Sequence, residues 1–189
     1  MKELLSKHLY LSEDGFAEFI SKAKQHTYRK REHLLNANEP VKKLFFIEKG
    51  LVRGYRILDG NDITHHFYVE NWFATDYESY LTNTTGELYL QALCDTNVYA
   101  FEKRTLLSLF EAQPKFEKIR SIMAEQAYLQ MVARLKDLQT NDLKERYHNL
   151  IRKSPELFSQ VSQKHIASYL GVAPQSLSRI RNSLKNTKS

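Results

Sequence analysis

The sequence is poor in the residue types that mark disulfide-rich, metal-binding and membrane proteins. Cys94 is the only cysteine among 189 residues. A disulfide framework, a zinc finger and a four-cysteine iron–sulfur cluster within the chain are therefore excluded. No apolar run approaches the length of a membrane span, and the segment from Met1 to Lys7 lacks the apolar core of a secretory signal. We expect a soluble, cytoplasmic protein that makes no contact with a membrane.

Patterns typical of enzymes are missing as well. The chain has no nucleophile–base pair, no metal-ligand spacing and no phosphate-binding loop, and its scattered acidic residues form no motif. His65 and His66 are adjacent on a predicted strand, so their side chains point to opposite faces and cannot chelate one ion together. A hydrogen-bonded histidine inside a barrel is the simpler interpretation. We expect no catalytic site, no metal and no resident cofactor.

The net charge of +6 is distributed unevenly along the chain. Residues 1–139 contain 19 Lys and Arg against 19 Asp and Glu, whereas residues 140–189 contain 9 against 3. A basic terminal segment attached to a neutral body suits binding to a phosphate backbone. The alternative is that the basic tail is simply solvated charge.

Residues 162–185 have the pattern of two short helices joined by a tight turn. Ser162 is suited to cap the first helix, and Gly171 lies where a left-handed residue would end it. Pro174 is suited to the first turn of the second helix. An ordinary helical hairpin is the alternative interpretation. The residues that would form the facing apolar stripes are Ile166, Ala167 and Leu170 in the first helix and Leu177, Ile180 and Leu184 in the second.

The opposite face of the second helix carries side chains that hydrogen-bond to base edges, namely Gln175, Ser178, Arg179 and Asn182. This pattern predicts a DNA-binding helix-turn-helix whose second helix enters the major groove. Lysine and arginine residues beside this face are expected to touch phosphates and to set the register. The residues expected to contact DNA are Ser162, Gln163, Lys164, Gln175, Ser176, Ser178, Arg179, Arg181 and Lys185.

The first part of the chain combines helices with short strands. Residues 1–26 are predicted to be helical, with a break near Ser12–Gly15. Asp59-Gly60 is a strong hairpin signal. Short strands separated by turn residues favour a β-sandwich or a jelly-roll barrel. The predicted strands are residues 44–47, 51–57, 63–69, 88–93 and 97–101.

A long helix is predicted after Pro114, and its apolar residues form two stripes. Ile119, Ile122, Met123, Leu129 and Ala133 lie on one side, and Tyr128, Met131, Val132, Leu135 and Leu138 lie roughly opposite. One stripe should pack on the β-domain, and the other on the same helix of a second copy. The helix between Phe116 and Leu138 is therefore predicted to form a homodimer, and residues 138–142 to form a hinge. The alternative is that this helix lies between two domains of one monomer.

This order of elements resembles the Crp/Fnr family of bacterial regulators, built like the cyclic AMP receptor protein. The matching residues are 45–53 in the barrel and 166–174 and 177–181 in the tail, and residues 73–79 are most similar to members from the Bacteroidetes. The resemblance implies an α+β fold with an N-terminal β-roll (1–113), a long dimerisation helix (114–139) and a C-terminal winged helix-turn-helix (140–189). It also implies a homodimeric transcription regulator that binds double-stranded DNA and acts with the transcription machinery.

The effector site departs from the family pattern. Family members that bind cyclic AMP use Gly-Glu-Leu followed by Arg-Ser-Ala, and these elements align near residues 74–76 and 86–88. The arginine position is Gly86, and the acidic Glu87 beside it opposes anion binding. We therefore expect no cyclic AMP binding in the usual mode, and the effector, if there is one, is unknown. Aromatics here suit either an effector pocket or an ordinary core. The candidate pocket residues are Phe73, Asp76, Tyr77, Glu78, Tyr89 and Tyr128.

One further function stays open on the sequence. In this alternative, the chain is an effector-binding protein whose basic C-terminal module contacts a protein partner instead of DNA. Steep weakening of binding with added salt would distinguish phosphate contacts from such a partner.

Overall fold

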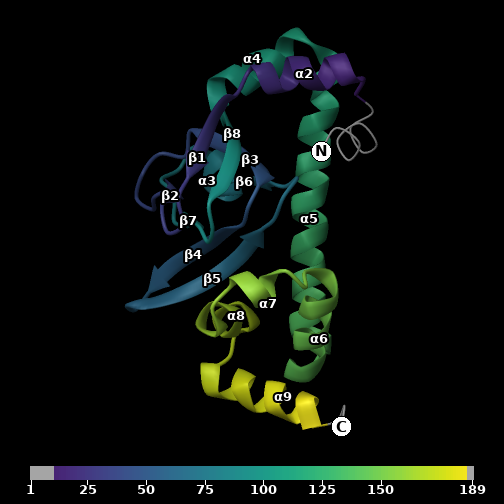
Figure 1. Ribbon diagram of the computed structural model, residues 1–189. Helices are drawn as coiled ribbons and strands as arrows, with labels where there is room; N and C mark the ends of the chain where they lie inside the picture. The colour runs from purple at the N-terminus through teal and green to yellow at the C-terminus, as the bar shows by residue number, and fades with distance from the viewer. Residues whose placement is uncertain (1–10, 187–189) are drawn as a thin grey trace. The chain divides into compact units, whose positions relative to one another are not determined.

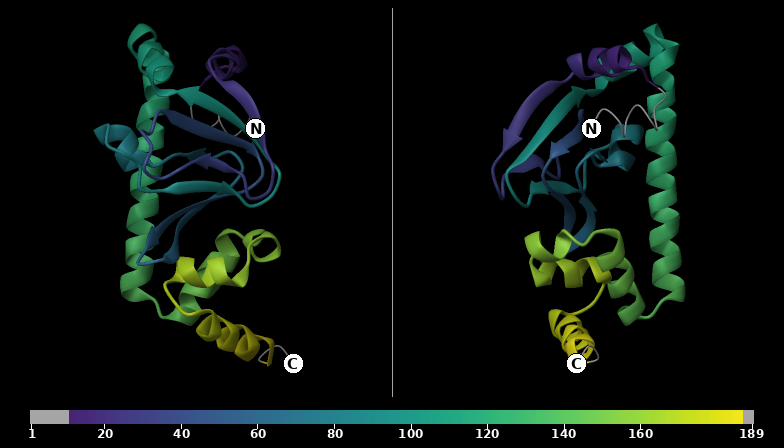
Figure 2. Two further views of the ribbon diagram at one scale, coloured as in Figure 1. Left: turned by 90° about the vertical axis from the view of Figure 1, so that its left-hand side faces the viewer. Right: turned by 45° about the vertical axis from the view of Figure 1, so that its right-hand side comes forward.

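The computed structural model describes residues 11–186, with side chains described through Ser183. Residues 1–10 of the predicted N-terminal helices and the side chains of Leu184 and Lys185 lie outside this part. The chain divides into two compact units (Figures 1 and 2). The first comprises the chain up to Gly54 together with Phe67–Leu129, and the second comprises Tyr55–His66 together with the chain from Gln130 onward.

The strands form two four-stranded sheets, in the orders β1-β8-β3-β6 and β2-β7-β4-β5. Strands β1, β6 and β8 pair antiparallel with their neighbours in the first sheet. The α+β class and the N-terminal β-sandwich expected from the sequence are confirmed. The strands are β1 (Lys24–Tyr28), β2 (His33–Leu35), β3 (Lys43–Lys49), β4 (Val52–Leu58), β5 (Asn61–Tyr68), β6 (Phe73–Ala74), β7 (Tyr89–Ala92) and β8 (Thr96–Glu102).

Two tight turns depend on positive φ angles. The β4–β5 hairpin turns at Asp59 and Gly60, whose φ angles of 50° and 74° are those of a type I′ turn, as Asp-Gly predicts. Gly50, between β3 and β4, has a φ of +116°. A Cβ at Gly50 would lie 2.5 Å from the Oγ1 of Thr96, so both the backbone angle and the space require glycine there.

Helices α2 (Glu13–Ser21) and α4 (Lys103–Ala112) lie together at one end of the strands (Figures 1 and 2). The hydroxyl of Ser12 caps α2 by accepting a hydrogen bond from the Gly15 N–H. Phe19 of α2 stacks on Phe101 with ring centroids 4.6 Å apart. This burial of an aromatic face fixes α2 against the sheet that contains β8.

The N-terminal prediction needs one correction. The helix ends at Ser21 instead of continuing to residue 26, because Lys24 begins β1 and pairs with Ala100 of β8. Ser12, within the predicted break, is the N-cap of α2, and Gly15 belongs to the first turn of that helix. The short helix α3 (Tyr77–Thr82) and strands β2 and β6 were not predicted. Each has two to six residues, which is too short for a periodic signal.

Helix α5 (Glu117–Thr140) follows the single turn η1 (Pro114–Phe116) and confirms the predicted long helix. Ile119 and Met123 are buried on its inner side. Leu129 is 64% exposed, so its assignment to the inner stripe was wrong, and Ala133 is exposed too. The large apolar side chains that α5 exposes are Tyr128, Leu129, Met131, Val132, Leu135 and Leu138.

The second unit continues from α5 into the C-terminal helices. Helix α5 ends at Thr140. Asp142 then caps the next helix in a reciprocal capping box with Glu145. The Oδ1 of Asp137 accepts hydrogen bonds from the Nδ2 of Asn141 (2.6 Å) and of Asn149 (2.9 Å), so this turn is held by side chains. The helices here are α6 (Leu143–Lys153), α7 (Leu157–Gln160), α8 (Gln163–Leu170) and α9 (Pro174–Asn186).

The predicted winged form of the C-terminal domain is not seen. From Gln130 to Asn186, the part of this segment that is described, the chain forms helices and turns and no strand. A wing needs a strand pair, so this part has two helices joined by a tight turn, α8 and α9, without a wing. Within residues 11–186 no helix is both long and apolar enough to cross a lipid bilayer.

Candidate nucleic-acid interface

The α8–α9 turn is built by local interactions. The Ser162 hydroxyl accepts a hydrogen bond from the His165 N–H at the start of α8. At its end Gly171 adopts a φ of 71°, and the Val172 N–H donates to the Ala167 carbonyl. Such a glycine reverses the chain without the steric cost of a Cβ. Pro174 then opens α9, so each predicted turn signal lies where the sequence placed it.

The two faces of α9 differ in exposure. Leu177 is fully buried, and Ile180 is half-buried. Gln175, Ser178 and Arg179 on the other face are exposed, as is Asn182. A row of donors and acceptors is therefore presented to solvent, while the apolar stripe packs toward α8.

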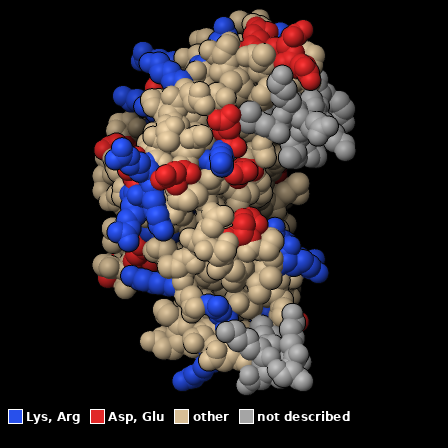
Figure 3. Space-filling view, viewed as in Figure 1, with Lys and Arg blue, Asp and Glu red and all other residues tan. Residues whose placement is uncertain are grey.

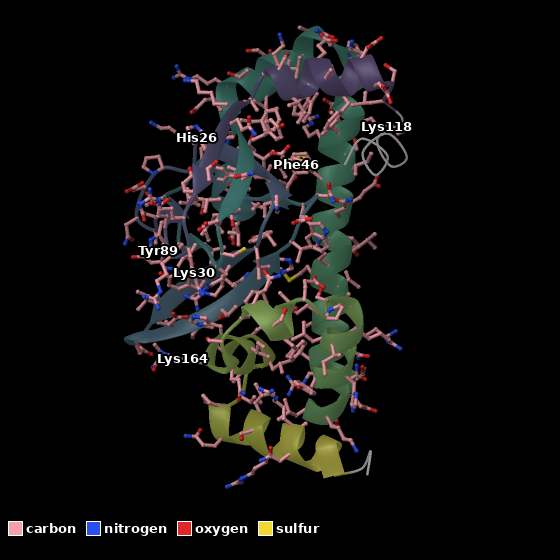
Figure 4. The ribbon with its side chains drawn as sticks, in the orientation of Figure 1. His26, Lys30, Phe46, Tyr89, Lys118 and Lys164 are labelled. Carbon is pink, nitrogen blue, oxygen red and sulfur yellow. The ribbon has the colours of Figure 1, made fainter. Side chains whose placement is uncertain are left out.

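The other residues expected at DNA lie around this face. Ser176 and Arg181 are half-buried on α9, whereas Ser162, Gln163 and Lys164 are exposed at the start of α8. Lys164 is labelled on α8 in Figure 4. The visible face of the C-terminal helices carries Lys and Arg with few acidic side chains (Figure 3). The structure thus brings the predicted residues of one unit onto two neighbouring helices.

Contacts that the sequence did not reveal fix α8 in the second unit. The Ser168 hydroxyl accepts a hydrogen bond from the Thr64 N–H at 2.8 Å and donates one to the Asp62 carbonyl at 3.1 Å. Both backbone groups belong to β5, which is an edge strand of its sheet. A side chain thus hydrogen-bonds the backbone of an edge strand, which stabilises the edge and attaches α8 to it.

Two arginines hold the C-terminal end of α8. Arg134 of α5 donates from Nη2 to the Tyr169 carbonyl (2.9 Å), and its guanidinium lies 4.2 Å from the centre of the Tyr169 ring. Arg146 of α6 donates from Nη1 to the Leu170 carbonyl (2.9 Å). The last carbonyls of a helix lack partners in the helix, and cations there also oppose the negative end of its dipole.

His66 lies in the same unit, on β5. Burial first, and then the nearby charges of Arg134 and His65, together lower the pKa of His66 from 6.5 to about 4. The imidazole is therefore neutral at pH 7. Its low pKa couples the stability of this unit to pH.

The six candidate effector residues lie in different surroundings. Phe73 contacts the ring of Phe46 at 5.1 Å, and Tyr77 stacks on Tyr80 at 6.4 Å. The Tyr89 ring lies 5.8 Å from the His33 ring, measured between ring centroids. Leu90 and Ala92 are the fully buried residues of β7, so Tyr89 lies on the outer side of that strand (Figure 4). Glu78 and Tyr128 are exposed, and Asp76 is buried. The described contacts do not join the six into one pocket.

Asp76 is the candidate with the most specific contacts. Its side chain is 5% exposed and caps α3 by accepting a hydrogen bond from the Ser79 N–H at 3.4 Å. Its Oδ2 also accepts hydrogen bonds from the N–H groups of Glu87 (2.8 Å) and Leu88 (3.1 Å). Glu87 is exposed, and it takes part in this cluster through its backbone N–H.

Comparisons with known proteins agree with this architecture. Residues 25–113 match the family model of the cyclic nucleotide-binding domain. A search of curated proteins finds no match to the chain. FixK2 from Bradyrhizobium japonicum aligns with a TM-score of 0.75 at 19% identity, covering 88% of this chain and 86% of that chain.

Two further solved structures share the fold. A CooA variant from Carboxydothermus hydrogenoformans aligns with a TM-score of 0.72 at 18% identity, covering 98% of this chain and 84% of that chain. A transcriptional regulator of the Crp/Fnr family from Eubacterium rectale aligns with a TM-score of 0.73 at 12% identity, covering 94% and 85%. At these identities the likeness establishes the fold.

Proposed function

We propose that this protein is a sequence-specific, homodimeric DNA-binding regulator, because residues 25–113 match the family model of the cyclic nucleotide-binding domain and the chain has the fold of Crp/Fnr transcriptional regulators. The observation that carries the proposal is the division of α9 into two faces. Leu177 is buried against the domain, while Gln175 and Arg179 remain exposed. Arginine pairs with guanine and glutamine with adenine in the major groove.

Charge supports the same function. Residues 140–189 carry 9 Lys and Arg against 3 Asp and Glu. Lys164 is exposed near the start of α8 and Arg181 is half-buried on α9, and we expect both to touch phosphates. Contacts of this kind supply affinity that is independent of base sequence and falls steeply with salt.

The exposed side of α5 supports the homodimer. Tyr128, Met131, Leu135 and Leu138 follow one another at intervals of three, four and three residues, Val132 lies beside Met131, and these five side chains are each 42% to 68% exposed. A helix seam of this spacing suits a two-fold pair of identical helices. Such a pair would present two copies of α9 to successive major grooves, roughly 34 Å apart on a pseudo-palindromic site.

Selection of bound duplexes from random DNA, followed by titration of Arg179→Ala, tests DNA reading. We expect the selected site to have two-fold symmetry and the variant to lose about 1–3 kcal/mol of binding free energy, with relaxed preference at one base position. Arg152→Ala is the matched control, because it removes the same charge from an exposed site on α6. Equal affinity and preference for both variants would refute the assignment of α9. Binding that does not weaken with salt would favour a protein partner.

The dimer has its own test. Leu135→Glu places a charge in the middle of the proposed seam, so we expect it to be a monomer in sedimentation equilibrium at concentrations where the parent is a dimer. Leu107→Glu on α4 is the control, because Leu107 is 40% exposed outside this seam. A parent protein that sediments as a monomer, or a Leu135→Glu variant that stays dimeric, would contradict the seam.

A regulator of this kind need not respond to cyclic AMP. Gly86 stands where cyclic AMP-binding relatives are expected to carry an arginine, and the buried carboxylate of Asp76 already accepts hydrogen bonds from the neighbouring backbone. We expect calorimetry with cyclic AMP to show no heat of binding at micromolar concentrations. A micromolar Kd would overturn this expectation.

A further inference from the structure

Asp76 makes more hydrogen bonds than a helix cap needs. An N-cap aspartate ordinarily accepts one hydrogen bond from the second or third residue of its helix. Here that bond, to the Ser79 N–H, is the longest of three at 3.4 Å. The two shorter bonds come from Glu87 and Leu88, in a segment 11 and 12 residues further along the chain. The carboxylate is thus held mainly by the segment that leads into β7.

The approach of that segment is itself built into the fold. The Gly86 N–H donates to the Glu39 carbonyl (3.0 Å), and the Gly86 carbonyl accepts from the Asn38 N–H (2.8 Å). A Cβ at Gly86 would lie 2.9 Å from the Val41 Cγ2 and 3.6 Å from the Asp76 Oδ2. The absence of a side chain at Gly86 therefore lets the backbone come close enough for two successive N–H groups to point at one oxygen.

The N–H groups of Ser79, Glu87 and Leu88 form an anion cradle, which here means a set of backbone donors that converge on one anionic group. Successive backbone N–H groups that converge on one point make a concave site for an anion. Hydrogen bonds from N–H to an ionised acceptor are stronger than those between neutral groups. Every hydrogen bond described for the Asp76 carboxylate comes from a backbone amide: those of Ser79, Glu87 and Leu88.

The space beside the carboxylate is taken as well. Tyr68 lies near Asp76, and its hydroxyl donates a hydrogen bond to the Thr75 carbonyl at 3.2 Å. Its ring is accommodated by Gly54, where a Cβ would lie 3.1 Å from the Tyr68 Cε2. The charge of Asp76 would also repel a second anion brought to the same amides.

We propose that Asp76 is the domain's own anionic ligand. Its carboxylate occupies the cradle formed by the N–H groups of Ser79, Glu87 and Leu88, and thereby closes that cradle to diffusible anions. Shortening the side chain vacates the cradle, and a small carboxylate of the formate class then binds in its place. This inference concerns the first unit alone and holds whether or not the protein binds DNA.

Asp76→Ser is the informative variant. A serine hydroxyl retains the ability to cap α3 through the Ser79 N–H, but it is too short to satisfy Glu87 and Leu88 as well. The amide resonances of these residues are followed by ¹H–¹⁵N NMR while sodium formate replaces sodium chloride at constant ionic strength. We expect saturable shifts at Glu87 and Leu88, with a Kd in the millimolar range because formate makes few contacts. The melting temperature of the variant should rise with the logarithm of the formate concentration.

Two controls make the result specific. The parent protein should show no saturable response to formate or to inorganic phosphate at these amides. Asp95→Ser removes another carboxylate that accepts a backbone N–H, that of Lys30, but at an exposed site, and its stability should be the same in both salts.

The proposal fails if the Glu87 and Leu88 amides of Asp76→Ser do not respond, or if the parent protein responds equally. If Asp76→Ser is unfolded in chloride, formate must restore the dispersed spectrum of the folded protein. Identical unfolded spectra in the two salts would then overturn the proposal.

Discussion

Removing one hydroxyl, that of Ser168, should loosen α8 from β5. Ser168→Ala deletes the bonds to the Thr64 N–H and to the Asp62 carbonyl, and Thr64 is fully buried. A typical hydrogen bond contributes about 1 kcal/mol net, and a buried backbone group deprived of its partner costs about 1–3 kcal/mol. Alanine is the better helix former by roughly 0.5 kcal/mol, which offsets part of the loss. We therefore expect a net loss of about 2 kcal/mol.

Hydrogen exchange of the Thr64 amide measures this loss where it occurs. A loss of that size corresponds to exchange faster by roughly 30-fold when opening is a local event. Urea unfolding of the second unit should show the same loss as a lower midpoint with an unchanged slope. The two measurements together separate local opening from global destabilisation.

Ser159→Ala is the matched control. Its hydroxyl is exposed and bonds to the Glu156 carbonyl three residues earlier in the chain, so the substitution carries the same change of helix propensity without the bond to β5. We expect a change within about 0.5 kcal/mol. If Ser168→Ala and Ser159→Ala unfold alike and the exchange of the Thr64 amide is unchanged, the contact between α8 and β5 is not formed in solution.

Two more predictions concern stability. Because the pKa of His66 is about 4 in the folded protein and its ordinary value is 6.5, the unfolded chain takes up the proton first as pH falls. Stability should decrease by about 1.4 kcal/mol per pH unit between pH 6.5 and 4, and His66→Gln should remove this slope in urea titrations. Gly50→Ala should lower the melting temperature much more than Gly171→Ala, because a Cβ at Gly50 would meet Thr96 whereas at Gly171 only the backbone angle, worth about 1 kcal/mol, opposes it. Equal melting temperatures would contradict that ranking.

The α8–α9 turn was the most predictable part of this protein. Its cap at Ser162, its turn at Gly171 and its buried Leu177 all depend on residues within one short segment. Local hydrogen bonds and a 3.6-residue period set such a motif, and both can be identified without knowledge of the rest of the chain. The exposure of Gln175 and Arg179 follows directly, because they lie on the face opposite the apolar stripe.

The candidate effector residues were less predictable. The sequence suggested one pocket lined by four aromatic and two acidic residues, but strand alternation places Tyr89 on the outer side of β7. Tyr128 lies on the exposed side of α5. The apolar character of a side chain indicates that it packs somewhere, and does not indicate against what.

By itself the sequence determined strands β3, β4, β5, β7 and β8, the long helix α5 and the reversal at Gly171, because each depends on residues that are neighbours along the chain. Only the tertiary structure decided which distant backbone groups meet a polar side chain. Asp76 accepts from amides 11 and 12 residues away, and Ser168 bonds to groups 104 and 106 residues earlier. Hydrogen bonds require donor and acceptor to match within a fraction of an ångström, and that match is set by the packing of the whole unit and leaves no periodic trace in the sequence.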